Sequence, residues 1–122
     1  MPTILIVEDE ARMRRLLELD LGEAGFSTLS APDAETALTL LAKEHVNLVL
    51  TDLKLPGMSG LELLQTARRS HAALPLVVMT AYGSIETAIE AMKAGAADYV
   101  LKPFSLAEIR MVVEKELNTR RL

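Results

Sequence analysis

The chain contains no cysteine among its 122 residues. This absence excludes a disulfide framework, a metal site built on thiolates and a thiol nucleophile. A sequence without cysteine is compatible with a reducing compartment, and we therefore expect a cytoplasmic protein.

Long apolar runs and an excess of positive charge are also missing. No stretch approaches the length needed to span a membrane, and the first residues, MPTILIVEDE, lack a basic segment followed by a long apolar one. The net charge is −4, and the only basic pair near the end is Arg120 and Arg121. We expect neither membrane association nor direct nucleic-acid binding by this chain.

Aromatic residues are scarce, with two Phe, two Tyr and no Trp, whereas half of all residues are apolar. The core must therefore be aliphatic, and the length suits one compact domain covering residues 1–122. Short runs rich in Val, Ile and Leu predict strands at 3–7, 47–51, 74–80 and 98–101, each buried on both faces. Residues 26–31 alternate apolar and polar side chains, which predicts a strand at a sheet edge.

Segments with helical periodicity separate these strands. Asp33 is a predicted N-cap, and Ser59-x-x-Glu62 and Ser105-x-x-Glu108 are predicted capping boxes. Gly25 and Gly95 are placed to end two helices. The Met and Leu stripes on the helices are expected to be core, including Leu16, Leu17 and Leu21 in the first helix and the stripe of Ile85, Ile89 and Met92 in the fourth. Five repeats of strand and helix predict an α/β fold, with a parallel sheet covered by helices on both faces.

Polar residues gather where the predicted strands end. Glu8, Asp9 and Glu10 follow the first strand, and Asp52, Thr80 and Lys102 follow the third, fourth and fifth. Such sheets bind ligands beyond the carboxyl ends of their strands. Each residue alone could be an ordinary turn residue, and Glu10 could equally be a helix cap. If the first and third strands are neighbours, however, the three carboxylates Glu8, Asp9 and Asp52 share one pocket, whose oxygen ligands favour Mg²⁺.

Four elements carry a resemblance to a known family: ILIVEDE at 4–10, VLTDLKLPGMSGLELL at 49–64, VVMTAYG at 77–83 and GAADYVLKPF at 95–104. In this order the chain resembles the receiver domain of bacterial two-component response regulators. The resemblance implies a flavodoxin-like sheet of strand order 2-1-3-4-5. The stretch from Thr80 to Phe104 is most similar to receivers of the nitrogen-regulation (NtrC) class.

The resemblance also implies a role for each site residue. Asp52 would be the phospho-acceptor that attacks a phosphohistidine. Asp9 and Asp52 would bind Mg²⁺ directly together with the main-chain carbonyl of Lys54, and Glu8 would assist through water. Glu8 stands where many members have Asp, and its longer side chain changes that water-bridged geometry. Lys102 would contact the phosphoryl group as a point charge.

Further residues would transmit or tune the signal. Thr80 would move toward the phosphoryl group, and Tyr99 would turn inward in response. Lys54 and Tyr82 border the phosphoryl position in relatives and would set its lifetime. The bond between Lys102 and Pro103 is expected to be cis.

Partners follow from the same resemblance. A sensor histidine kinase would dock around Arg12 and Met13, although both residues could equally be ordinary helix surface. The output would be a covalently attached segment, an AAA+ ATPase with a DNA-binding module in the class named above, so that residues 1–122 would be the N-terminal part of a transcription regulator. Phosphorylation would drive homodimerisation through the fourth helix, fifth strand and fifth helix. The chain would be a switch that catalyses only its own phosphorylation and dephosphorylation.

Three other functions remain possible at this point. A flavodoxin-like cofactor binder would share the fold, but Glu8, Asp9 and Glu10 would repel a flavin phosphate. A phosphatase of the haloacid dehalogenase type needs a second acid two residues after the nucleophile, where this chain has Lys54. A receiver that acts without phosphorylation, as a pure interaction module, is the third.

Overall fold

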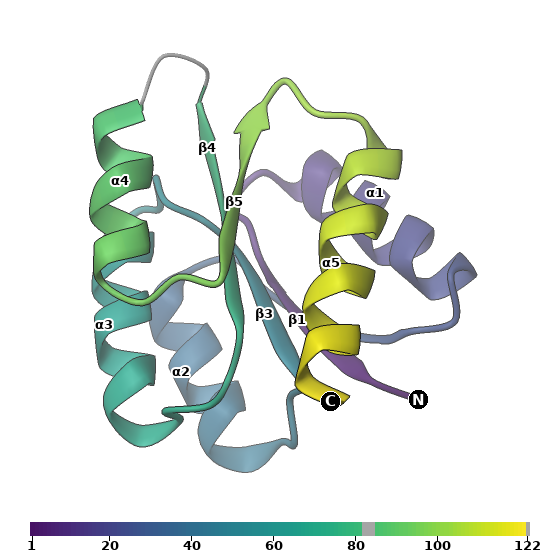
Figure 1. Ribbon diagram of the computed structural model, residues 1–122, viewed down its shortest axis with the longest axis horizontal. Helices are drawn as coiled ribbons and strands as arrows, with labels where there is room; N and C mark the ends of the chain where they lie inside the picture. The colour runs from purple at the N-terminus through teal and green to yellow at the C-terminus, as the bar shows by residue number, and fades with distance from the viewer. Residues whose placement is uncertain (82–84, 122) are drawn as a thin grey trace.

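Five strands and five helices alternate along the chain (Figure 1). The computed structural model describes residues 1–81 and 85–121. The strands are β1 (Thr3–Val7), β2 (Ser27–Ala31), β3 (Leu48–Asp52), β4 (Leu76–Ala81) and β5 (Asp98–Lys102), and the helices are α1 (Ala11–Glu23), α2 (Ala34–Lys43), α3 (Gly60–Ser70), α4 (Ile85–Lys93) and α5 (Leu106–Arg121).

The strands form one parallel sheet in the order β2-β1-β3-β4-β5, which confirms the predicted fold class. In the centre of the sheet, Val7 at the end of β1 lies opposite Thr51 near the end of β3. The residues that follow β1 are therefore brought beside the last residue of β3. This register sets the geometry of the polar edge described below.

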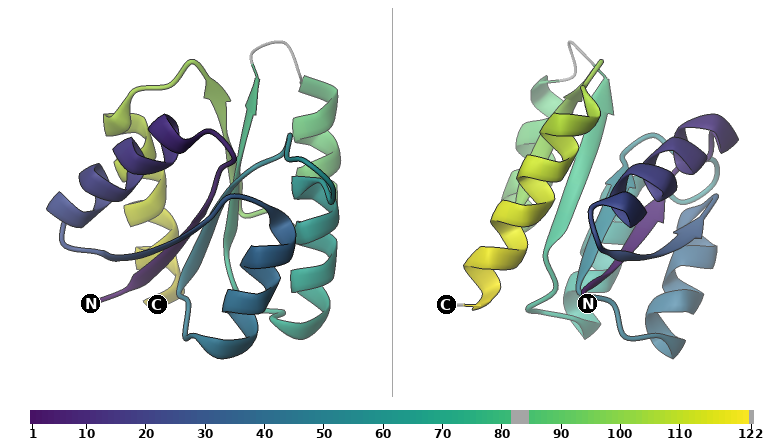
Figure 2. Two further views of the ribbon diagram at one scale, coloured as in Figure 1. Left: turned by 180° about the vertical axis from the view of Figure 1, so that it is seen from behind. Right: turned by 90° about the vertical axis from the view of Figure 1, so that its right-hand side faces the viewer.

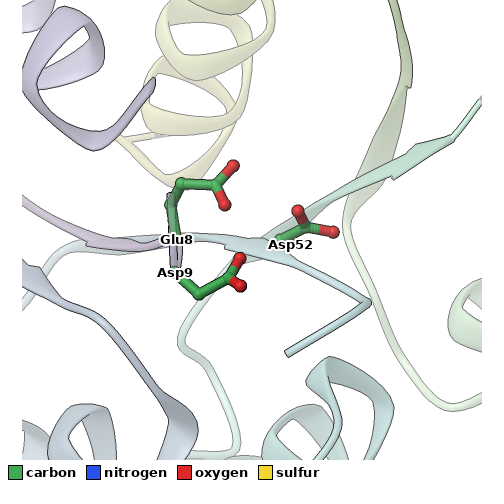
Figure 3. Close-up of side chains that lie close together, drawn as sticks. All are labelled: Glu8, Asp9 and Asp52. Carbon is green, nitrogen blue, oxygen red and sulfur yellow. The ribbon is translucent and has the colours of Figure 1, made fainter. Parts of the chain in front are cut away.

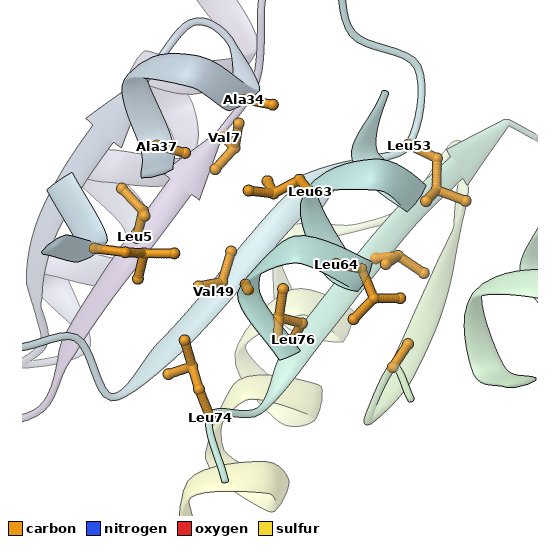
Figure 4. Packing of buried hydrophobic residues seen from close by; sticks show 14 of the residues in the cluster. Leu5, Val7, Ala34, Ala37, Val49, Leu53, Leu63, Leu64, Leu74 and Leu76 are labelled. Atoms are coloured by element: carbon orange, nitrogen blue, oxygen red, sulfur yellow. The ribbon is translucent and has the colours of Figure 1, made fainter. Parts of the chain in front are cut away.

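Helices cover both faces of the sheet (Figures 1 and 2). Helices α2, α3 and α4 lie on one face, and α1 and α5 lie on the other. Each face has its own aliphatic core, since alternate residues of a strand point to opposite sides. Leu5 and Val49 meet Leu63 and Leu64 of α3 on the first face (Figure 4), and the second core includes Ile6, Leu50, Leu17 of α1 and Ile109 of α5.

The predicted helix ends are confirmed. Asp33 accepts a hydrogen bond from the Thr36 amide at 2.7 Å. Ser59 and Glu62 form a reciprocal capping box, and the Ser105 hydroxyl accepts from the Glu108 amide at 3.1 Å. Gly25 and Gly95 both have positive φ, at 98° and 108°, as a left-handed helix stop requires.

Two expectations about burial are wrong. Strand β5 is not buried on both faces, because it lies at an edge of the sheet and only Val100 is fully buried. The apolar stripe of α4 is not core either. Ile85, Ile89 and Met92 are 40–48% exposed, and the helix instead buries Ala88 and Ala91.

Helix α1 shows a smaller difference of the same kind, since Leu16 is 50% exposed while Leu17 and Leu21 are buried. The helix turns these two leucines toward the sheet, which leaves Leu16 at the margin. No helix among residues 1–81 and 85–121 has the length and apolar character needed to cross a membrane.

Candidate acidic site at the carboxyl edge of the sheet

Three carboxylates meet at the carboxyl edge of the sheet (Figure 3). Asp52 is the last residue of β3, and Glu8 and Asp9 directly follow β1. One carboxylate oxygen from each of the three lies within 4.8 Å of the others. Glu8 and Asp52 are almost fully buried, whereas Asp9 is exposed. The sequence therefore predicted correctly that the side chains of Glu8, Asp9 and Asp52 lie in one pocket.

An ammonium group neutralises part of this charge. Lys102 is the last residue of β5, and its Nζ lies 2.6 Å from Asp52 Oδ2 and 3.3 Å from Glu8 Oε1. Strand β4 separates β5 from β3, so the long lysine side chain reaches across the end of a strand to make these contacts. Residues 8, 52 and 102 are thus joined in one ionic group although they are far apart in the sequence.

Burial and charge together shift two pKa values at this site. Loss of hydration is the largest influence on Glu8 and raises its pKa. The negative charge of Asp52 acts in the same direction, while the Glu10 amide, which donates to Glu8 Oε2 at 3.2 Å, and Lys102 oppose it. For Lys102, burial alone would lower the pKa, but the hydrogen bond and charge of Asp52 and the charge of Glu8 together outweigh it and raise the pKa.

Hydrogen bonds from backbone amides hold the loop that follows β3. The Lys54 amide donates to Asp52 Oδ1 at 3.0 Å, the Leu53 amide donates to the Met79 carbonyl at 3.0 Å, and the Gly60 amide donates to the Leu53 carbonyl at 2.9 Å. The first residue of α3 lies so close to β3 that a Cβ at Gly60 would clash with the Asp52 carbonyl oxygen. Gly60 is therefore a positioning residue of the site, which sequence reasoning missed.

A hollow of about 740 Å³ opens over the acidic group. Its lining includes Thr80, which is 3% exposed, and it also includes Ser59 and Thr87. Thr87 belongs to the first turn of α4 and was not predicted as a site residue. Helical periodicity would have placed Thr87 on the face opposite Ile85, Ile89 and Met92, so no local signal in the sequence marked it as a site residue.

Of the other residues predicted for the site, some line this hollow and some lie elsewhere. Glu10 lines the hollow and occupies the N-cap position of α1, but its side chain makes no capping hydrogen bond. Tyr99 on β5 is 37% exposed, and it lines a shallow hollow with residues of α4 such as Ile89. The Lys102–Pro103 peptide bond is cis. Tyr82 lies outside the described residues.

The fold and this edge define a class. At its carboxyl edge, a doubly wound parallel sheet presents a buried aspartate, two further acids, a threonine and a lysine, and the acids offer the oxygen donors that suit a hard cation such as Mg²⁺. Residues 4–114 match the response regulator receiver domain, and the chain belongs to this family.

Relatives support this membership. The chain is 46% identical over 95% of its length to the response regulator protein PilR of Pseudomonas aeruginosa and 43% identical over 93% to the regulatory protein AtoC of Escherichia coli. It is 40% identical over 98% to the nitrogen assimilation regulatory protein NtrX of Azorhizobium caulinodans. These are regulators of the NtrC class. The chain spans only about a quarter of each, with 26%, 25% and 27% of their lengths covered.

Solved structures of other proteins have the same fold as this chain. NtrX from Brucella abortus, in a crystal structure with ADP, aligns with 99% of this chain at a TM-score of 0.94 and 36% identity, and 28% of that chain is covered. A response regulator receiver domain protein from Clostridium thermocellum aligns with a TM-score of 0.94 over 99% of this chain and 98% of its own, with 24% identity. Family membership decides against the flavodoxin-like and phosphatase alternatives, because a receiver is a signalling domain.

Proposed function

We propose that this chain receives a phosphoryl group on Asp52 from the phosphohistidine of a sensor histidine kinase. A carboxylate oxygen of Asp52 would attack phosphorus in line, the bond from phosphorus to the imidazole nitrogen would break, and the leaving ring would take up a proton. The observation that carries the proposal is the place of Asp52. It is buried, with Oδ1 held by the Lys54 amide and Oδ2 by Lys102, beneath an open hollow.

The acidic group has the composition of a Mg²⁺ site. Its donors are all oxygen, and burial of Glu8 beside Asp52 is electrostatically unfavourable, as its raised pKa indicates. Asp9, Asp52 and the Lys54 carbonyl would hold the ion, and Glu8 would act through water. When bound, the ion would offset the repulsion between an incoming phosphoryl group and the carboxylates.

Lys102 is the second positive charge available to the phosphoryl group. Its ammonium lies against Asp52 and Glu8, so a phosphoryl group on Asp52 could take over the contact now made by the carboxylates. The hydroxyl of Thr80 would donate a hydrogen bond to the phosphoryl group, and Tyr99 would turn inward from its present half-exposed position on β5. Lys54 and Tyr82 would set the lifetime of the phosphoryl group.

The output would be a shift between two conformations of the surface formed by α4, β5 and α5. This surface exposes Ile85, Ile89, Met92 and Met111, and we propose that it forms a homodimer after phosphorylation. The kinase would dock near Arg12 and Met13 on α1.

Residues 1–122 would form the receiver of a longer cytoplasmic regulator. The short coverage of PilR, AtoC and NtrX supports an attached output segment, for which an AAA+ ATPase with a DNA-binding module is our proposal. Catalysis would be confined to the phosphorylation and dephosphorylation of Asp52 itself.

The test is the intact mass of the protein after incubation with acetyl phosphate. We expect one added phosphoryl group in the presence of Mg²⁺ and none in its absence or in the Asp52→Asn variant. If no adduct forms and a beryllofluoride trap also fails to bind, the pocket is idle and the chain acts as an interaction module independent of phosphorylation.

A further inference from the structure

Arg68, at the C-terminal end of α3, binds carbonyl groups from two separate loops. Its Nη1 donates to the carbonyls of Ala72 at 2.8 Å and Leu74 at 2.7 Å, both in the loop before β4. Its Nη2 donates to the carbonyl of Gly95 at 2.7 Å, which lies 27 residues away after α4. Hydrogen bonds from a guanidinium are stronger than neutral ones, and the planar fork fixes the direction of both arms.

The contact with Gly95 fastens the C-terminal end of α4. The Gly95 amide donates to the Met92 carbonyl and the Ala96 amide donates to the Ala91 carbonyl, so this glycine is part of the helix stop. A Cβ at Gly95 would lie only 3.1 Å from Arg68 Nε. The guanidinium therefore lies directly against the backbone here, and it ties the end of α4 to α3.

The rest of α4 is weakly attached by comparison. Its buried residues are Ala88 and Ala91, which offer little apolar surface, while its larger side chains face outward. Its N-terminal turn carries Thr87 to the hollow above Asp52. The two ends of this helix therefore differ, since one is held by a charged side chain and the other borders the acidic site.

We propose that Arg68 is a positioning residue that makes the C-terminal end of α4 a fixed pivot. With this end held, a change at Asp52 displaces mainly the N-terminal end of the helix. The proposal rests on the function proposed above, because it concerns how phosphorylation would be transmitted to α4.

Hydrogen exchange in the unphosphorylated protein tests the tether directly. We expect Arg68→Met to speed exchange of the Gly95 and Ala96 amides by about tenfold relative to amides of α1. Arg69→Met is the matched control, since the hydrogen bond of Arg69 is to Thr66 on its own helix. If Arg68→Met folds poorly, Arg68→Lys keeps one charged donor and should give a smaller increase at the same amides. Equal exchange in the Arg68 and Arg69 variants would overturn the tether.

The pivot is tested with beryllofluoride and Mg²⁺ as a phosphoryl mimic. In the unaltered protein, we expect amide chemical shifts to change more at residues 85–89 than at 93–96, and in Arg68→Met we expect the changes to extend to both ends. Equal changes at both ends of the unaltered protein would refute the pivot. Failure of the mimic to bind would instead count against the proposed function, and the exchange experiment would still decide the tether.

Discussion

Replacing Gly60 by alanine should damage the site through the backbone of Asp52. An ideal Cβ at this position would lie 2.6 Å from Leu53 Cα and closer still to the Asp52 carbonyl oxygen. Both neighbours are backbone atoms, so the start of α3 and the end of β3 must separate. Overpacking of this kind costs about 3 kcal/mol at the upper end of its usual range. In a domain of this size the thermal midpoint should fall by roughly 10 °C.

Gly22→Ala is the matched control. Gly22 lies within α1, and a Cβ there would meet nothing within 4 Å. The same change should therefore stabilise the protein by about 0.5–1 kcal/mol, because alanine is the better helix former. Thermal unfolding followed by circular dichroism compares the two variants, and Mg²⁺ titration should show weaker binding only in Gly60→Ala. Changes of stability in the same direction for both variants would refute this reasoning.

Three other perturbations probe the charges at the carboxyl edge. Glu8→Gln should raise the thermal midpoint at pH 7 without Mg²⁺, because the raised pKa of Glu8 means that its ionised form opposes folding. The gain should disappear below pH 4.5, where Glu8 is neutral in the folded and unfolded states. A gain that persists in acid would contradict the raised pKa of Glu8. Lys102→Met should lower the free energy of unfolding by about 2 kcal/mol, because it leaves the carboxylates of Glu8 and Asp52 without the ammonium that pairs with them. In urea unfolding, Mg²⁺ should restore part of this loss. An unchanged urea midpoint would argue against the ionic group. Mg²⁺ at ten times its dissociation constant should stabilise the unaltered protein by about 1.4 kcal/mol. Asp9→Asn should remove most of this stabilisation. Full stabilisation of the Asp9→Asn variant by Mg²⁺ would exclude Asp9 as a ligand.

The sequence predicted the fold because its local signals agree with one another. Asp33, Ser59 and Ser105 begin helices as expected. The four apolar runs and the alternating segment at 26–31 correspond to the five strands. The convergence of Glu8, Asp9 and Asp52 was also predictable. It follows from the parallel direction of the strands and from the pairing of β1 with β3, which the family resemblance implied.

Other features depended on contacts between distant segments. The need for glycine at position 60 comes from the approach of α3 to β3, which no local pattern reveals. The contact of Arg68 with Gly95 spans 27 residues, and on the sequence Arg68 is only one of two adjacent arginines.

The exposure of Ile89 and Met92 was mispredicted for a physical reason. Apolar periodicity marks an apolar face of a helix, but it does not say whether the sheet or another molecule covers that face. In α4 the sheet takes the two alanines, and the larger side chains remain outside.

Chemical mapping of the phosphorylated residue tests the central claim most directly. Borohydride reduces an aspartyl phosphate to homoserine, so the protein would be treated with acetyl phosphate and Mg²⁺, reduced, digested and sequenced by mass spectrometry. We predict homoserine at position 52 and aspartate retained at position 9. Homoserine at Asp9, or none at position 52 in a sample whose intact mass shows the adduct, would contradict the account.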